Sequence, residues 1–359
     1  MKQFPAVVFL LLAATSAFAV PKAFVPNQGD ETISVIDIAG GTIEATLNAT
    51  SNPLGIAQTA DGSTLYVTNE NAGSVAIIDT ATNTITGTIL LPTNRPAGIS
   101  LSPDESTLLV ADPFSDALHE VDVASATVSG TLTLDSPAQA QFSADGSKAW
   151  VSLTNTGDIE VVDTASLTVS STISSVGTNP GGLLLDDAND RLYVATQGNL
   201  VIIDTSTDSV TDTVSLGASG HSGAGIALDT STGLLYVGNA DTGEVKVVDT
   251  ATDMVTNTFT PGGEPRGLAL TPDNSSLFLL DHANDQALVL DPATGTVNAT
   301  IAVGPEPQAR GNFIVDAPSA QSGSNPIPTM SPTGLLVAVS LMLIAGVWMA
   351  RHRRHRRSK

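Results

Sequence analysis

One pattern repeats through this chain, and it reads Leu65-Tyr66-Val67-Thr68-Asn69 followed by Ile77-Ile78-Asp79-Thr80-Ala81-Thr82. It returns as Leu235-Tyr236-Val237-Gly238-Asn239 followed by Val248-Asp249-Thr250-Ala251-Thr252. The aspartate that ends the second half of the pattern occurs at spacings of 42, 43, 41, 41, 45 and 42 residues, at Asp37, Asp79, Asp122, Asp163, Asp204, Asp249 and Asp291. A fixed period of roughly 20 to 50 residues is typical of repeat architectures. The chain therefore contains seven copies of one structural unit.

Each copy contains four short apolar runs separated by turn-forming residues. In one copy the runs are Ala97–Leu101, Leu108–Ala111, Leu118–Val123 and Thr127–Leu134. Four strands per repeat are typical of one blade of a propeller. Runs such as Val75-Ala76-Ile77-Ile78 are apolar on both faces, as expected for a sheet that lies between two neighbouring sheets. We therefore predict an all-β, seven-bladed β-propeller of four-stranded antiparallel blades over residues 20–316.

The order of the runs also predicts how the ring closes. The first copy starts at Phe24-Val25 and lacks an innermost strand, whereas the chain has an extra apolar run at Asn312-Phe313-Ile314-Val315. We expect this last run to complete the first blade, which would remove both free sheet edges. The chain contains no cysteine, so no disulfide ties the ring together and no thiolate is available for metal binding or catalysis.

The repeated segments resemble the YVTN family of β-propeller repeats. The resemblance rests on Leu65-Tyr66-Val67-Thr68-Asn69, on Ser102-Pro103-Asp104 and on the recurrence of the pattern in register over residues 23–316. Members of this family are often secreted or surface proteins of bacteria and archaea. The resemblance implies a seven-bladed propeller but no single function.

The two ends of the chain predict export and anchoring. Residues 1–19 carry Lys2, a short apolar stretch and Ala17-Phe18-Ala19, which indicate a cleaved signal peptide, with a retained N-terminal anchor as the alternative. Residues 333–350 are uncharged and apolar and would span about 27 Å as a helix. Six basic residues follow within the tail at 351–359. The positive-inside rule places this tail in the cytoplasm and the repeats outside, at the cell envelope or surface.

Residues 317–332 form an uncharged tether rich in Pro, Ser and Gly. The tether ends in a stretch that resembles the bacterial IPTL-type sorting signal, through Ile327, Pro328, Thr329, Met330, Ser331 and Gly334. Met330 stands where that signal has Leu, and Thr333 stands where a Trp is usual. The resemblance implies a sorting protease of the exosortase-like kind as a partner.

Charge narrows the choice of partners. Between the signal peptide and the anchor lie 36 acidic and seven basic residues, a balance of −29. The electric field of this negative charge repels the phosphates of a nucleic acid, so we expect no nucleic-acid partner.

The loops that enter each innermost strand share a face with those that join the second and third strands, and this loop face surrounds the channel mouth. The first group of loops carries Arg95, His221, Glu264, Arg266, Glu306 and Arg310; the second carries Asp112, Asp116, Asp241, Asp281, His282 and Asp285. Our candidate ligand-binding residues are Arg95, His221, Glu264, Arg266, Arg310 and His282. The three arginines would suit an anionic group on a ligand. The alternative, which we favour, is that they pair with Glu264, Glu306 and neighbouring acids.

Other conspicuous residues have structural explanations. The seven repeated aspartates are expected to accept backbone N–H bonds in turns rather than to bind metal. The segment Asp186–Asp190 resembles a calcium loop only in composition, so we expect a solvated turn. Gly220-His221-Ser222-Gly223-Ala224 departs from the nucleophile-elbow pattern at its last position. The ring residues at one strand position are expected to pack between blades: Phe24, Tyr66, Trp150, Tyr193, Tyr236 and Phe278.

The leading hypothesis is a non-enzymatic, membrane-anchored propeller that binds a protein or glycan through the loop face or serves as an envelope component, without a cofactor. The alternative is a calcium-dependent lactonase or hydrolase with its site at the channel mouth.

Overall fold

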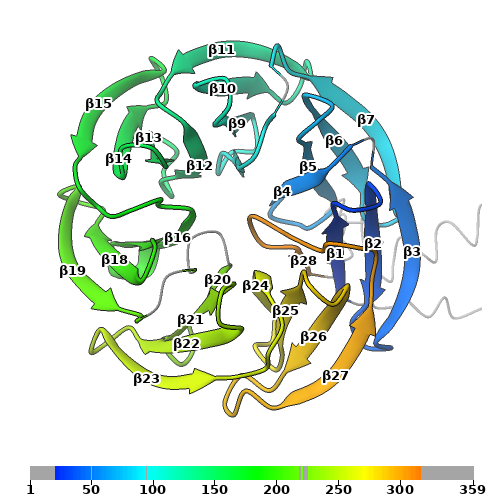
Figure 1. The fold of residues 1–359 in the computed structure, drawn as a ribbon. Helices are drawn as coiled ribbons and strands as arrows, with labels where there is room; N and C mark the ends of the chain where they lie inside the picture. Colours follow the sequence, from blue (N-terminus) through cyan, green and yellow to red (C-terminus); the bar gives the residue numbers. More distant parts are fainter. Residues whose placement is uncertain (1–20, 50, 94, 218–219, 221–224, 317–359) are drawn as a thin grey trace, which may run out of the picture. The chain divides into compact units, whose positions relative to one another are not determined.

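The computed structural model describes residues 21–49, 51–93, 95–217, 220 and 225–316. Within these residues, 28 strands form seven four-stranded antiparallel sheets. Figure 1 shows the sheets arranged in chain order around a central channel. The predicted seven-bladed propeller is therefore confirmed.

The blades contain four strands each, and the first sheet joins the two ends of the ring. Blade 1 consists of β28 (Ile314–Val315), β1 (Lys22–Asn27), β2 (Thr32–Asp37) and β3 (Thr42–Asn48). Blade 2 consists of β4 (Pro53–Gln58), β5 (Thr64–Asn69), β6 (Ser74–Asp79) and β7 (Thr84–Leu90). Blade 3 consists of β8 (Ile99–Leu101), β9 (Thr107–Asp112), β10 (Ala117–Asp122) and β11 (Thr127–Thr133).

The other blades follow the same order. Blade 4 consists of β12 (Pro137–Phe142), β13 (Lys148–Leu153), β14 (Asp158–Asp163) and β15 (Thr168–Ile173). Blade 5 consists of β16 (Gly182–Asp186), β17 (Arg191–Ala195), β18 (Asn199–Asp204) and β19 (Ser209–Ser215), with a short 3₁₀ helix, η1 (Asp187–Asn189), between its first two strands. Blade 6 consists of β20 (Ile226–Asp229), β21 (Leu234–Asn239), β22 (Glu244–Asp249) and β23 (Met254–Phe259). Blade 7 consists of β24 (Pro265–Leu270), β25 (Leu277–Asp281), β26 (Gln286–Leu290) and β27 (Val297–Ala302).

The predicted terminal segments lie outside the described residues. They are the signal peptide at 1–19, the tether at 317–332 with its sorting motif, the transmembrane helix at 333–350 and the tail at 351–359. In the part of the chain that the structure does describe, no helix is both long enough and apolar enough to cross a membrane.

Burial follows position within each blade. The second strands are buried along nearly their whole length, as in β5 and β25. The fourth strands are mostly exposed, and in β11 exposed and half-buried residues alternate. A β-bulge interrupts the pairing of the third and fourth strands in every blade, for example between Ile77 and Ile78 in blade 2. Because a bulge increases local twist, this recurrent irregularity turns each outer strand away from the plane of its blade.

The ring residues at the shared strand position pack between blades, as predicted. Phe24, Tyr66, Trp150, Tyr193, Tyr236 and Phe278 are all at most 5% exposed. Two of them also donate a hydrogen bond to the next blade along the chain: Trp150 Nε1 donates to Asp208 at 2.8 Å, and the Tyr236 hydroxyl donates to Pro292 O at 3.0 Å. Lys148 reaches the same Asp208 carboxylate at 2.8 Å. Aromatic burial and these contacts together fix neighbouring blades side by side.

The seven repeated aspartates cap turns, as predicted. Each carboxylate accepts a backbone N–H two or three residues further on; in blade 2 Thr82 N donates to Asp79 Oδ1 at 2.7 Å. In blade 5, hydrogen bonds from the Ser206 hydroxyl first, and then from the Thr207 amide and hydroxyl, lower the pKa of Asp204 from 3.8 to about 2. The aspartate series is thus a structural feature of the repeat.

The ring closes at blade 1 as the sequence predicts. Ile314 and Val315 pair antiparallel with Ala23 and Lys22. Phe24 N donates to Phe313 O at 2.8 Å. Strands from the two ends of the repeat region therefore share one sheet, which leaves blade 1 with the same four strands as the others.

Truncation of Phe313 tests this closure. The Phe313 side chain is fully buried, so Phe313→Ala should lower the free energy of unfolding by about 3–5 kcal/mol. Val297→Ala, at a residue 38% exposed on β27, is the control and should change it by less than about 0.5 kcal/mol. Equilibrium urea unfolding measures both, and equal stabilities of the two variants would contradict the closure.

The aspartate turns predict a specific acid response. Because the folded-state pKa of Asp204 is below the ordinary value, its stabilising contribution is complete above about pH 3.8 and is lost as the pH falls toward about 2. Ser206→Ala removes the main hydrogen bond and should raise the Asp204 pKa toward 3.8. NMR titration of the carboxyl groups measures the pKa of Asp204, and Ser170→Ala, in another blade, is the control that should leave this pKa unchanged. An Asp204 pKa unmoved by Ser206→Ala would refute this explanation.

Candidate functional site

The loops of the predicted loop face do lie together. In blade 3, Arg95 N donates to Asp112 Oδ2 at 3.2 Å. In blade 7, Glu264 N donates to Asp281 Oδ1 at 2.9 Å, and His282 N donates to Glu264 O at 3.0 Å. The loop that enters an innermost strand is therefore hydrogen-bonded to the loop that joins the second and third strands of the same blade.

Arg95 joins two blades at this face. Its Nη2 lies 2.8 Å from Glu70 Oε1, and its Nε donates to the same oxygen at 3.2 Å. The guanidinium carbon also lies 3.6 Å from the ring centre of Phe114. Phe114 is 63% exposed, and the backbone amides of Phe114 and Ser115 both donate to the buried carboxylate of Asp112. The result is an exposed aromatic ring stacked on an arginine and held by a fixed turn.

Arg266, Glu264 and His282 form a second group in blade 7. Arg266 Nε donates to Glu264 Oε1 at 2.8 Å, which neutralises the guanidinium locally. His282 Nδ1 is buried and has no hydrogen-bond partner among the described residues. Arg95 and Arg266 thus follow the favoured alternative of pairing with acids. The acid that pairs with Arg95 is Glu70, which the sequence analysis did not single out.

Arg310 differs from the other basic residues of the propeller. Six of the seven basic residues form an ion pair with a carboxylate: Lys22, Arg95, Lys148, Arg191, Lys246 and Arg266. No described carboxylate lies within ion-pair distance of Arg310. Its Nε is buried without a partner, and its Nη1 makes only a long hydrogen bond of 3.4 Å to Ala138 O. Burial lowers the pKa of this guanidinium, while the charge of Glu70 raises it.

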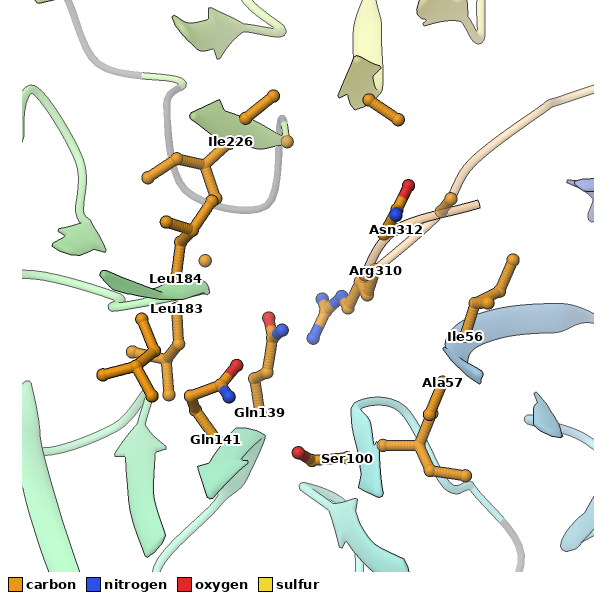
Figure 2. A pocket seen from close by; sticks show the side chains of 18 of the residues that line it. Ile56, Ala57, Ser100, Gln139, Gln141, Leu183, Leu184, Ile226, Arg310 and Asn312 are labelled. Atoms are coloured by element: carbon orange, nitrogen blue, oxygen red, sulfur yellow. The ribbon is translucent and has the colours of Figure 1, made fainter. Parts of the chain in front are cut away.

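Backbone hydrogen bonds fix Arg310 at the inner wall of the ring. Its N–H donates to Leu54 O at 3.1 Å, and its carbonyl accepts from Ile56 N at 2.8 Å. The next residue, Gly311, has φ of +115°, and a Cβ there would lie 2.2 Å from Ile56 O. Only glycine allows the two inner strands to approach this closely. The side chain before it is therefore directed into the channel from a fixed backbone (Figure 2).

The channel contains a cavity of about 390 Å³, lined by the innermost strands of blades 2 to 7 and by residues 309–312. Figure 2 shows Arg310 extending into this channel cavity from one side, with the amide side chains of Gln139 and Gln141 on the other. Apolar side chains complete the wall, among them Ile56, Ile99, Leu183, Ile226 and Leu268. Polar atoms make up most of the exposed lining, and convergent polar groups of this kind orient small ligands.

Gln139 occupies a position that holds glycine in blades 2 and 3. It follows Pro137 by two residues, as Gly55 follows Pro53 and Gly98 follows Pro96. The Gln139 side chain is 7% exposed, and β12 shows a register irregularity between Pro137 and Gln139. This substitution in the repeat brings an amide into the channel opposite Arg310.

The remaining sequence candidates are placed as follows. Residues 221–224, which include the candidate His221, lie outside the described residues. The sorting motif also lies outside them. Residues Asp187–Asn189 form the turn η1, in which Asn189 Nδ2 donates to Asp186 Oδ2 at 2.8 Å, as expected for a structural turn. Among the described residues, no group of three or more His, Asp or Glu side chains is arranged to hold a metal ion.

Sequence reasoning missed the residues that distinguish one blade from another. Glu70 and Phe114 lie in loops of ordinary length, and Gln139 and Gln141 lie in a strand that reads as part of the core. The usable signal was a departure from the repeat, since Gln139 replaces the glycine of neighbouring copies.

Seven closed blades, a loop face and a polar channel cavity define this chain as a seven-bladed β-propeller. A model of the YNCE-like β-propeller family matches residues 35–230, more than half of the chain. The chain belongs to this family, which agrees with the resemblance to YVTN repeats. A sequence search of curated proteins finds no match.

Solved structures with the same fold have dissimilar sequences. A chain of hydrazine synthase from Kuenenia stuttgartiensis has a TM-score of 0.67 and 18% identity, covering 80% of this chain and 99% of that one. A functionally unknown protein from Desulfotomaculum acetoxidans DSM 771 has a TM-score of 0.69 and 15% identity, and the match covers 81% of this chain and 99% of that one. The dihydro-heme d1 dehydrogenase NirN, in complex with DHE, has a TM-score of 0.60 and 14% identity, and the match covers 82% of this chain and 74% of that one. At these identities the likeness shows the fold alone.

Proposed function

We propose that this protein is a non-enzymatic propeller, displayed outside the membrane, whose loop face binds a protein or glycan. The observation that carries the proposal is Phe114, an aromatic ring 63% exposed and stacked on Arg95. Aromatic and arginine side chains are enriched at the energetic centres of interfaces. Asp112 and Glu70 already hold this pair in place, so a partner would meet a surface that loses little conformational entropy on binding.

The ends of the sequence support the location. A signal peptide at 1–19, a tether at 317–332 and an apolar segment at 333–350 followed by a basic tail would export the propeller and hold it at the envelope by a single membrane pass. The motif from Ile327 to Gly334 would offer a site to a sorting protease. The balance of −29 in the exported part disfavours a nucleic-acid partner.

The proposal includes no cofactor and no catalytic residue. The enzymatic alternative, a calcium-dependent hydrolase at the channel mouth, requires several oxygen ligands around one ion. The charged groups described at the channel mouth instead include a guanidinium, Arg310, which opposes cation binding.

Replacement of Phe114 tests the loop face as the binding surface. The full-length protein, purified in detergent, is applied to arrays of glycans and of extracellular proteins, and the affinity for each captured binder is measured. Phe114→Ala should weaken that affinity at least tenfold, about 1.4 kcal/mol. Met254→Ala is the matched control because Met254 is also 63% exposed but lies on β23, an outer strand. Equal affinities of Phe114→Ala and the unaltered protein would contradict a role of this face.

The location has its own test. Protease added to intact cells should digest a propeller that is displayed outside, while a tag placed after Lys359 should stay protected in the cytoplasm. Cell lysis exposes the tag and serves as the control. A propeller that resists protease until lysis would show that the chain is not displayed.

A further inference from the structure

The channel cavity contains a positive charge that the fold itself leaves without a partner. Every other basic residue of the propeller is paired with a carboxylate, whereas the Arg310 side chain has, among the described residues, one hydrogen-bond partner, the carbonyl of Ala138 at 3.4 Å. The Arg310 side chain is half-buried, and its Nε is shielded from water without a hydrogen-bond partner among the described residues. An N–H of this kind is costly, because the hydration that it loses is not replaced. The propeller has 36 acidic residues, yet none of them lies within ion-pair distance of Arg310, although the charge of Glu70 acts on it from further away. The cavity is therefore complementary to an anion that the protein does not supply.

Backbone hydrogen bonds hold the main chain at Arg310 in a fixed position at the channel wall. The two residues before it are hydrogen-bonded to blades 1 and 7: Gln308 N donates to Pro26 O and Ala309 N donates to Arg266 O, each at 3.0 Å. Sites built on such rigid elements hold their ligands with little reorganisation. The planar fork of a guanidinium matches the two oxygens of a carboxylate.

The charge of the surroundings limits the ligand to a single negative charge. Arg266, whose charge acts on Arg310, is already paired with Glu264, and the propeller as a whole is strongly acidic. A phosphate monoester carries between one and two charges near neutral pH, since its second pKa is about 6. A carboxylate carries one charge and therefore suits a cavity with one unpaired cation.

The rest of the lining indicates hydroxyl groups on the ligand. The Gln139 and Gln141 amides border the cavity opposite Arg310, and amides can both donate to and accept from hydroxyls (Figure 2). Gln58 also lines the cavity, and its Oε1 is buried and accepts no hydrogen bond from the described residues. Ile56, Leu183 and Ile226 provide apolar surface for carbon atoms between these polar groups.

We propose that the channel cavity binds a small hydroxylated monocarboxylate of the sugar-acid class, with its carboxylate on Arg310 and its hydroxyls on Gln139 and Gln141. A cavity of about 390 Å³ lies at the small end of the range for such ligands, roughly 300–1,000 Å³. This site is separate from the Phe114 surface, so it stands or falls independently of the loop-face function proposed above.

Titration with D-glucuronate tests the proposal on the full-length protein in detergent. Calorimetry should show saturable binding of glucuronate, accompanied by a rise in Tm, because a ligand that binds only the folded state stabilises it. D-glucose, which has the same ring and no charge, should bind at least about tenfold more weakly. Phosphate is the second comparison, and binding of phosphate as tight as that of glucuronate would overturn the ligand class.

Variants assign the binding to the channel. Arg310→Gln should weaken glucuronate binding at least about tenfold, and Arg310→Lys should weaken it less because the charge is kept and the planar fork is lost. Lys246→Gln removes one positive charge from β22, the third strand of blade 6, which does not line the cavity, and is the matched control; it should leave the affinity unchanged. Gln139→Ala should weaken glucuronate binding and leave Arg310 in place.

A structure of the unaltered protein with glucuronate decides the case if Arg310→Gln does not fold. The expected result is the carboxylate of the ligand beside the Arg310 guanidinium and its hydroxyls near Gln139 and Gln141. No glucuronate binding by the unaltered protein, or a ligand seated outside the channel, would overturn the proposal.

Discussion

The closing segment, residues 307–315, determines both the ring and the candidate site. Its final part supplies β28, so that Phe24 and Phe313 are joined across the ends of the repeat region by a backbone hydrogen bond of 2.8 Å. Its first part lies between blades 7 and 2 through the bonds from Ala309 N and Arg310 N. The chain has no disulfide, so the hydrogen-bonded pairing of β28 with β1 is the noncovalent link that closes the seven blades into one ring. The same segment places Arg310 in the channel.

The basic residues show how this acidic chain uses scarce positive charge. Lys148 and Arg191 each reach from one blade to the turn of the next, at Asp208 and Asp253, and so help to align the blades. Pairs of this kind at partly exposed positions contribute little energy each, on the order of 1 kcal/mol or less. Since the six other basic residues are all paired with carboxylates, Arg310 is the one cation of the described propeller without an acidic partner. An acidic surface and a single unpaired channel arginine together favour a ligand with one negative charge.

The sequence predicted the features that repeat and missed those that do not. Strand number, aspartate turns, the buried ring residues and the closing strand all follow from periodicity, because each copy must satisfy the same packing and hydrogen-bonding requirements. The partner of Arg95 could not be predicted, since Glu70 belongs to another blade and only the ring geometry brings the two together. The contrast between Arg266, which is paired, and Arg310, which is not, also depends on side-chain positions that spacing does not encode.

Hydrogen exchange of the closing segment tests the central claim most directly. If residues 307–315 seal the ring, the amides of Arg310 and of its bonded neighbour Ile56 open only with the whole propeller. Their exchange in the native protein should then be as slow as that of the buried strand β13. Exchange of these amides within seconds, while β13 stays protected, would show that the seam opens by itself. In that case Arg310 would have no fixed place in the channel.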